Sequence, residues 1–279
     1  NWPYSVEYKV LSGGSGVEKI KALSIVIATG TTPNLLGVEG ENVYFGKGVS
    51  TCAICDGGLY KNKIVAVVGG GFAAVSEASY LSALAKKVYM ILRRDKFRAA
   101  GRVLDDLLSR DNIEVLYNSR VSKVVGNGKR LTGVVITSID DGKSDNGKVS
   151  SLDSYNKIDG KKLEIDGLFL AIGSRPNSGF VKGVLKLDKR GFIKTRLPES
   201  QETTVKGIFV AGDVSANQEF KQAIAAAGTA CSAALEVQDF LENTGFDPVE
   251  FNKLLGNYSG VVDSFYEVKD NFDNVGKNK

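Results

Sequence analysis

A glycine-rich turn lies in the first third of the chain, in the sequence Val67-Val68-Gly69-Gly70-Gly71-Phe72-Ala73-Ala74. It follows an apolar run, 63–68, that is typical of a buried strand, and it opens an Ala-rich run, 73–84, with helical spacing. A G-x-G-x-x-A pattern between a strand and a helix is the fingerprint of a dinucleotide site. Gly69 makes the tight turn, Gly71 lets the backbone approach a pyrophosphate at the helix N-terminus, and Ala74 keeps helix and strand close.

The end of the next predicted strand, 87–92, distinguishes between cofactors. An acidic residue there would bond a ribose 2′-hydroxyl, whereas arginine accommodates a 2′-phosphate. Arg93, Arg94 and Arg98 follow this strand, and planar guanidinium groups can hold a phosphate through two hydrogen bonds. A solvated basic turn would leave three arginines at one place unexplained. The sequence therefore predicts NADPH rather than NADH as the nucleotide.

The same alternation of apolar run, glycine turn and amphipathic run recurs along the chain, which predicts an α/β fold. Further strands are expected at 23–28, 113–117, 133–137, 168–172 and 207–214, and a long helix at 220–241. The polar segment 138–162 is expected to be a solvated hairpin loop without a function of its own.

Composition removes several classes of protein. The 279 residues carry a net charge of +4, and no block of Lys and Arg with interleaved aromatics predicts nucleic-acid binding. The sequence contains no histidine, which excludes Ser-His-Asp hydrolases and zinc sites with histidine ligands. No apolar run reaches the length of roughly 18 to 20 residues that a membrane span needs, so no membrane partner is expected.

Three cysteines are present, and two of them form a Cys-x-x-Cys motif, Cys52 and Cys55. A structural zinc site made of cysteines needs four thiolates, so no metal site is predicted and reversible disulfide chemistry is the leading use. The alternative is a pair of small buried hydrophobic residues. Asp56 follows directly and is the best local candidate for the acid that protonates a departing thiolate. Cys231, in the long predicted helix, is expected to be a packed core residue.

A nicotinamide delivers a hydride, whereas a disulfide is reduced through thiolate exchange, so a flavin is the usual intermediary. Residues 207–213 read as a strand that ends in Gly212 and Asp213. The carboxylate of Asp213 would bond a ribityl hydroxyl of FAD at the start of the helix that follows.

Together these segments resemble the low-molecular-weight NADPH-dependent thioredoxin reductases. The resemblance runs in the family's order from about residue 22 to 242. Its motifs are Ala28-Thr29-Gly30, Cys52-Ala53-Ile54-Cys55-Asp56-Gly57, 69–74, Arg93-Arg94-Asp95 with Phe97-Arg98-Ala99, Ala171-Ile172-Gly173 with Pro176-Asn177, 207–214, and Gln222-Ala223 with Ala227-Gly228-Thr229.

The resemblance implies two Rossmann-like three-layer domains, with an NADPH domain inserted into an FAD domain that is N-terminally incomplete here. The regions are 1–36 and 175–242 for the FAD domain, 37–174 for the NADPH domain with the redox motif, and 243–279 for a polar tail. Thr29, Gly30, Gln222 and Ala223 would lie in the FAD site.

The resemblance also assigns roles at the redox motif. Cys55 would face the flavin, Cys52 would attack thioredoxin, and Asp56 would act as the acid. The resemblance also implies a homodimer. Free thiol chemistry fits a reducing interior, so the cytoplasm is expected, with a plastid as the alternative compartment. The chain departs from the family at Ser76, where Glu is frequent in the helix after the glycine turn.

Three other readings remain open from the sequence. The same site would suit the flavin subunit of a peroxiredoxin-reducing system or a small-molecule dithiol oxidase. The absence of the family's first FAD-binding unit, expected before Asn1, would also suit a truncated module that binds NADP(H) without catalysis.

Overall fold

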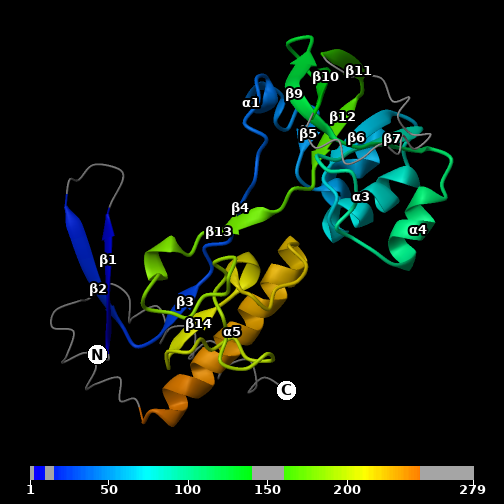
Figure 1. Cartoon of the computed structure of the whole chain (residues 1–279). Helices are drawn as coiled ribbons and strands as arrows, with labels where there is room; N and C mark the ends of the chain where they lie inside the picture. The colour runs from blue at the N-terminus through cyan, green and yellow to red at the C-terminus, as the bar shows by residue number, and fades with distance from the viewer. Residues whose placement is uncertain (1–2, 10–15, 140–159, 246–279) are drawn as a thin grey trace, which may run out of the picture. The chain divides into compact units, whose positions relative to one another are not determined.

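The computed structural model describes residues 3–9, 16–139 and 160–245, and the chain divides into two compact units. Unit 1 comprises Asn1–Thr31 with Pro176–Lys279, and unit 2 comprises Thr32–Arg175. The chain passes between the units in β4 (Thr31–Pro33) and β13 (Ser174–Pro176), which pair with each other (Figure 1). Which cofactor each unit serves stays a prediction.

Unit 2 is built on a parallel sheet with the strand order β5-β12-β6-β7-β8. The strands are β5 (Val49–Ser50), β6 (Ile64–Val68), β7 (Lys87–Ile91), β8 (Ile113–Leu116) and β12 (Gly167–Leu170). The central strand β6 is apolar throughout and almost wholly buried, as expected of a parallel strand that is covered on both faces.

The two faces of this sheet are covered differently. On one face, Val65 and Val67 pack in one cluster with Ala74 and Ala78 of α3 (Phe72–Ser82) and with Leu107 of the neighbouring helix. That helix is α4 (Arg102–Leu108). The other face packs against an antiparallel sheet, which makes the unit three-layered. The antiparallel strands are β9 (Ser119–Gly126), β10 (Leu131–Ser138) and β11 (Lys161–Glu164).

Three short helical segments complete the described part of unit 2: α1 (Glu41–Tyr44), α2 (Ala53–Asp56) and the 3₁₀ helix η1 (Gly57–Tyr60). α2 and η1 follow β5 directly and lead into β6, so the Cys-x-x-Cys motif lies between two strands of the parallel sheet.

Unit 1 contains a parallel pair, β3 (Ile25–Ile27) with β14 (Ile208–Val210), and an antiparallel hairpin, β1 (Tyr4–Lys9) with β2 (Val17–Ala22). The long helix α5 (Ala223–Asn243) packs on β14 through Ala233, Val237 and Phe240, which surround Phe209. The 3₁₀ helices are η2 (Gly179–Val181) and η3 (Gly212–Val214), and η3 directly follows β14.

The predicted α/β class is confirmed, and the expected strands and helices are present with small shifts of their ends. The hairpin β1–β2 and the strands β9 and β11 were not predicted. Most of the predicted loop 138–162 and of the polar tail 243–279 lies outside the described residues.

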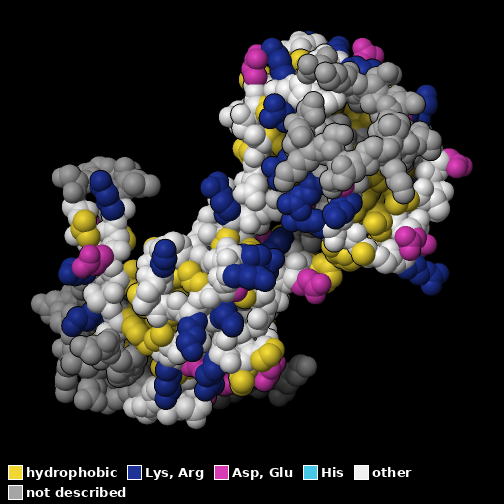
Figure 2. All heavy atoms as spheres, in the orientation of Figure 1, with side chains coloured by type: hydrophobic (Ala, Val, Ile, Leu, Met, Phe, Trp, Pro, Cys, Tyr) yellow, Lys and Arg dark blue, Asp and Glu magenta, His cyan; other side chains and the backbone are white. Residues whose placement is uncertain are grey.

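Lys and Arg side chains are spread over both units on the face that Figure 2 shows. This distribution agrees with a chain whose net charge is only +4.

Candidate active site

The glycine turn of unit 2 joins β6 to α3 and has the geometry that its sequence predicts. Gly69 has a φ of 141°, and a Cβ there would lie 2.5 Å from the Ala171 carbonyl oxygen and 2.9 Å from the Ala74 Cβ. A larger residue therefore has neither the backbone conformation nor the space. Gly71 has an extended conformation, with a φ of −92°, and it directly precedes α3.

The segment that carries the predicted phosphate-binding arginines is bonded to this turn. The backbone N–H groups of Arg98 and Ala99 both donate to the Gly70 carbonyl, at 2.7 and 3.2 Å. A Cβ on Gly71 would lie 3.2 Å from a guanidinium nitrogen of Arg98. Arg98 and the glycine turn therefore form one cationic, backbone-lined cradle, which suits a nucleotide phosphate.

Arg93 and Arg94 are exposed on the turn that follows β7. Leu92, just before them, is buried and would contact a side chain at Gly70. The proximity of Arg93 and Arg94 to a 2′-phosphate stays a prediction, since neither side chain is hydrogen-bonded to the glycine turn among the described residues.

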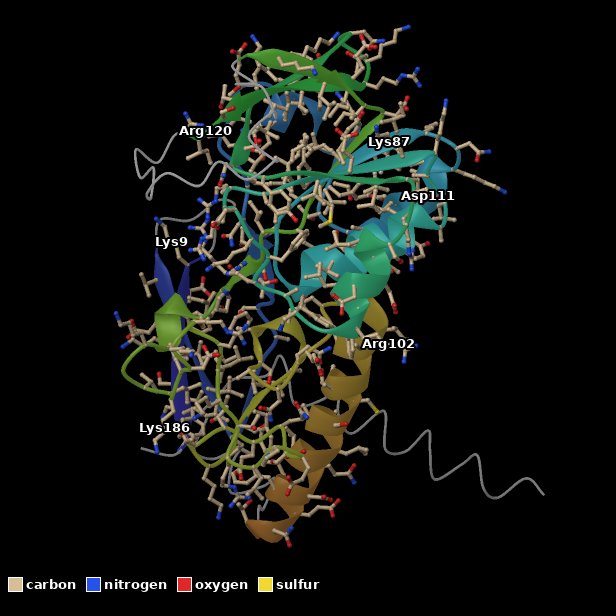
Figure 3. The ribbon with its side chains drawn as sticks, turned by 45° about the vertical axis from the view of Figure 1, so that its right-hand side comes forward. Lys9, Lys87, Arg102, Asp111, Arg120 and Lys186 are labelled. Atoms are coloured by element: carbon tan, nitrogen blue, oxygen red, sulfur yellow. A yellow bond between two sulfur atoms is a disulfide. The ribbon has the colours of Figure 1, made fainter. Side chains whose placement is uncertain are left out.

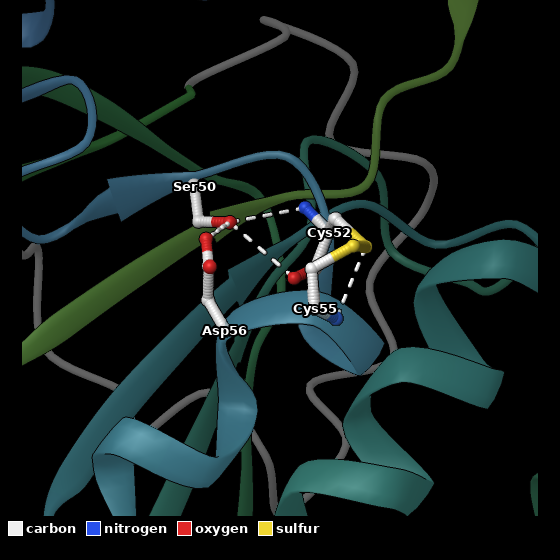
Figure 4. Close-up of a disulfide and its surroundings, with 4 residues drawn as sticks. All are labelled: Ser50, Cys52, Cys55 and Asp56. Atoms are coloured by element: carbon white, nitrogen blue, oxygen red, sulfur yellow. Dashed lines mark hydrogen bonds between the residues drawn. A yellow bond between two sulfur atoms is a disulfide. The ribbon is translucent and has the colours of Figure 1, made fainter. Parts of the chain in front are cut away.

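The Cys52–Cys55 pair forms a disulfide, with the Cα atoms 5.3 Å apart. Cys52 caps the N-terminus of α2, and its Sγ accepts a 3.2 Å hydrogen bond from the Cys55 backbone N–H (Figure 4). Cys55 is exposed and Cys52 is partly exposed. A thiolate on Cys52 would be able to keep this backbone donor.

Ser50 connects the disulfide to Asp56. Its hydroxyl donates a 2.6 Å hydrogen bond to Oδ2 of Asp56 and accepts a 3.0 Å hydrogen bond from the Cys52 backbone N–H (Figure 4). The structure thus brings the three predicted residues of the redox motif into one bonded group. The analysis of the sequence missed Ser50, although its place two residues before Cys52 could have suggested it.

A second residue that sequence reasoning missed is Glu77, on α3. Its carboxylate accepts a hydrogen bond from the Ala53 backbone N–H, and burial raises its pKa from the ordinary 4.5 to about 7. Ser76, the departure noted above, is exposed instead. The half-buried carboxylate beside α2 is therefore that of Glu77.

In unit 1, three of the six predicted flavin residues line a hollow of about 430 Å³. Its lining includes Gly30, Gly212 and Asp213, together with small residues of α5 such as Ala226 and Ala230. Oδ1 of Asp213 is buried with no hydrogen-bond partner among the described residues. An unsatisfied carboxylate oxygen is costly unless a ligand donates to it, so these residues fit the ribityl hydroxyl of a flavin.

The neighbouring contacts hold this hollow in shape. Gly212 has a φ of 68°, and its N–H donates to Oγ1 of Thr229, at 2.9 Å, on α5. Lys221 donates a 2.8 Å hydrogen bond to the Asp213 carbonyl, and burial lowers the pKa of this lysine. Lys221 is a further residue that the sequence did not single out.

Three predicted flavin positions lie outside the lining of this hollow, two of them at the start of α5. Gln222 caps this helix and Ala223 opens it. Thr29 is bonded to Asn177, both through its hydroxyl and through its carbonyl. Their contacts with a flavin stay predictions.

One prediction is wrong. Cys231 is exposed on α5 rather than packed in a core, because Ala233 is the single buried residue of this helix. Among the described residues, no cluster of three or more Cys, Asp or Glu side chains could hold a metal ion.

Comparison with known proteins assigns the chain to a family. Residues 5–231 match the family model of the pyridine nucleotide-disulphide oxidoreductases. The chain is 42% identical over 226 residues to a thioredoxin reductase of Dictyostelium discoideum, which covers 80% of this chain and 65% of the relative. It is 39% identical to a thioredoxin reductase of Spironucleus barkhanus, over 80% of this chain and 67% of the relative.

The solved structures agree. A thioredoxin reductase from Giardia duodenalis superposes with a TM-score of 0.69 at 35% identity, and the match covers 86% of this chain and 75% of that one. The chain spans 62% to 65% of the length of three curated relatives that it matches. It belongs to the pyridine nucleotide-disulphide oxidoreductase family, and within that family to the thioredoxin reductases.

Proposed function

We propose that the chain works as a thioredoxin-disulfide reductase, in which electrons pass from NADPH via FAD to the Cys52–Cys55 disulfide and on to thioredoxin. The observation that carries this proposal is the disulfide itself, which caps a helix and is hydrogen-bonded through Ser50 to an acid. A structural disulfide needs no such acid, whereas thiol exchange needs a proton donor for the leaving thiolate.

Different residues of this chain would bind the two cofactors and carry out thiol exchange. The Gly69–Gly71 turn and Arg98 would bind the NADPH phosphates, and the hollow with Asp213 would hold FAD. When bound, FAD accepts a hydride and releases an electron pair to a disulfide. Cys52 would then attack the disulfide of thioredoxin through a mixed disulfide, while Asp56 protonates the thiolate that leaves.

The test is the rate of NADPH-dependent thioredoxin reduction by Cys52→Ser. We expect this variant to lose turnover and to keep NADPH binding, because the nucleotide residues lie elsewhere in the unit. Cys231→Ser is the matched control, since this exposed cysteine lies outside the motif, and it should retain the full rate. Turnover that survives in Cys52→Ser would overturn the proposal.

The visible absorption spectrum tests the cofactor half of the proposal separately. We expect flavin bands in the purified protein that bleach when NADPH is added without oxygen. A colourless protein that binds NADPH tightly would instead favour a nucleotide-binding module. Turnover with peroxiredoxin-linked or small-molecule disulfides, but not with thioredoxins, would favour the two related activities named above.

The name of each relative supports thioredoxin as the partner. We further propose a homodimer that acts in the cytoplasm, with a plastid as the alternative, and with neither nucleic acid nor a membrane as partner. Among the helices that the structure describes, none is long and apolar enough to cross a membrane.

A further inference from the structure

Glu77 is a half-buried ionisable side chain, with one fully buried carboxylate oxygen, that the proposed function leaves without a role. It lies at the middle of α3, whose Ala74 and Ala78 share a core cluster with Ala53 of α2. Gly57, which follows α2, comes so close to α3 that a Cβ there would lie 2.8 Å from the Tyr80 ring. α2 therefore rests directly on the helix that carries Glu77.

The two carboxylate oxygens of Glu77 have different surroundings. One accepts a hydrogen bond from the Ala53 backbone N–H, which is the first residue of α2. The other, Oε2, is buried with no hydrogen-bond partner among the described residues. An ionised carboxylate is poorly satisfied there, whereas a protonated one has a smaller desolvation cost.

Cys52 and Glu77 both accept hydrogen bonds from backbone N–H groups in the one turn of α2. The Cys52 sulfur accepts from the N–H of Cys55, and the Glu77 carboxylate accepts from the N–H of Ala53. In the disulfide, Cys52 carries no charge. A thiolate on Cys52 would place a second negative charge at this turn, and two such charges in a partly buried site disfavour each other.

No charged side chain is among the causes of the shifted Glu77 pKa, which are burial and the Ala53 hydrogen bond. Arg102 and Lys87, both labelled in Figure 3, have side chains that are 93% and 36% exposed. The ionisable residues on the elements that pack against α3 are Cys55 and Asp56 on α2, Arg102, Asp105 and Asp106 on α4, and Lys87 and Tyr89 on β7.

We infer that Glu77 is a positioning residue of the redox pair, which holds the first turn of α2 through Ala53 and takes up a proton when Cys52 becomes a thiolate. Two electrons from a dithiol or a reduced flavin break the S–S bond. One sulfur takes a proton and becomes a thiol, the other remains a thiolate, and the second proton goes to Glu77. The inference rests on the proposed function only in requiring a disulfide that is reduced and reoxidised.

The experiment measures thiolate formation in the full chain, reduced with dithiothreitol and then freed of it. Iodoacetamide alkylation is followed from pH 5 to 9, and the tryptic peptide 48–61, which contains both motif cysteines, is quantified by mass spectrometry. Glu77→Gln keeps an oxygen for the Ala53 N–H but cannot ionise. We expect its alkylation at pH 8, where Glu77 of the wild type is largely ionised while the thiol is neutral, to be at least threefold and up to roughly tenfold faster than that of the wild type, because the competing charge is gone.

Controls separate this effect from a loss of structure. Glu39→Gln removes a carboxylate whose side chain is 73% exposed in the same unit, and its profile should match that of the wild type. A change of less than threefold in Glu77→Gln overturns the inference. So does a shift that appears in Glu77→Ala alone, since it would show that only the hydrogen bond matters.

A second measurement needs no change at Glu77, in case its variants fail to fold. Infrared difference spectra of Asp56→Asn, recorded at pH 8 on reduction, should gain a band of a protonated carboxyl. Absence of that band overturns the inference. Neither experiment uses NADPH, flavin or thioredoxin, so a failure of the proposed function would not affect the outcome.

Discussion

Ser50 and Asp56 are joined by a 2.6 Å hydrogen bond in which the hydroxyl donates to the carboxylate. Ser50 ends the short strand β5, and Asp56 ends α2, so the bond closes the loop that contains both cysteines. The same hydroxyl accepts from the Cys52 N–H. One buried side chain thus fixes Asp56, the proposed acid, and Cys52, the proposed attacking cysteine, relative to each other.

Ser50→Ala should lower the rate of disulfide reduction by roughly tenfold, because an acid that is no longer held in place protonates the leaving thiolate less often. NADPH binding should be unchanged. The measurement is the single-turnover rate with a protein disulfide. Ser109→Ala, which removes a hydroxyl from the end of α4, is the control.

A double variant of Ser50 and Asp56 tests whether the two residues act together. In an Asp56→Asn background, Ser50→Ala should cause little further loss, because both changes act through one group. Losses that simply multiply would show that Ser50 acts without Asp56.

Gly71→Ala should weaken NADPH binding without lowering the stability of the fold. The backbone of Gly71 is extended, with a φ of −92°, so alanine is not strained there. Its Cβ would meet only the movable end of the Arg98 side chain, at 3.2 Å. It would nevertheless fill the space that a pyrophosphate needs at the helix N-terminus. We expect an unchanged urea midpoint and an NADPH dissociation constant that rises by roughly tenfold or more.

Gly69→Ala should instead lower the stability of the fold, and it serves as the comparison. A Cβ 2.5 Å from the Ala171 carbonyl and a φ of 141° predict a loss of roughly 3 kcal/mol of stability. Equal stability of the two variants would show that the structural difference between the glycines has no thermodynamic effect.

The glycine turn also shows which structural features can be predicted from the sequence. Its pattern predicted β6, α3 and the tight packing of Gly69 on Ala74, because each depends on residues that are close in the chain. Glu77 could not be found in this way. Its burial depends on the docking of α2, which precedes β6 in the chain, and an acid in a helix ordinarily reads as a solvated residue.

The prediction that Cys231 is a buried core residue failed for a related reason. The spacing of Ala and apolar residues predicts correctly that α5 is a helix, but periodicity does not reveal which faces other elements cover. In the described structure only Ala233 of this helix is buried. The hairpin β1–β2 was missed although Tyr4, Val6 and Tyr8 alternate with polar residues. None of the residues in the two strands is buried, so this short alternation is not reinforced by an apolar run.

Arg98→Ala should reduce the preference for NADPH over NADH. Its guanidinium lies beside Gly71, and a hydrogen-bonded cation contributes roughly 1.5 to 3 kcal/mol to phosphate binding. We therefore expect NADPH affinity to fall by roughly tenfold to a hundredfold while NADH affinity is nearly unchanged, as measured by fluorescence titration. Arg102→Ala, at a side chain that is 93% exposed, is the control. A parallel fall for both nucleotides would place Arg98 at the pyrophosphate instead.

Glu77 should make the stability of the oxidised protein depend on pH. Burial raises its pKa from 4.5 to about 7, so the folded state keeps a proton that the unfolded chain releases between these values. The stabilisation is complete below pH 4.5 and is lost as the pH rises through 7. With allowance for partial exposure, it amounts to roughly 2 kcal/mol.

Urea unfolding followed by far-UV circular dichroism, at pH 5 and pH 8, measures this contribution. Between these conditions wild type should lose roughly 2 kcal/mol relative to Glu77→Gln, which has no proton to release. Other ionisable groups cancel in the comparison because both proteins contain them. Glu39→Gln should follow the wild type, since its carboxylate is exposed. If the difference between wild type and Glu77→Gln is the same at both pH values, Glu77 is ionised in the folded protein throughout this range, and burial alone does not hold its proton.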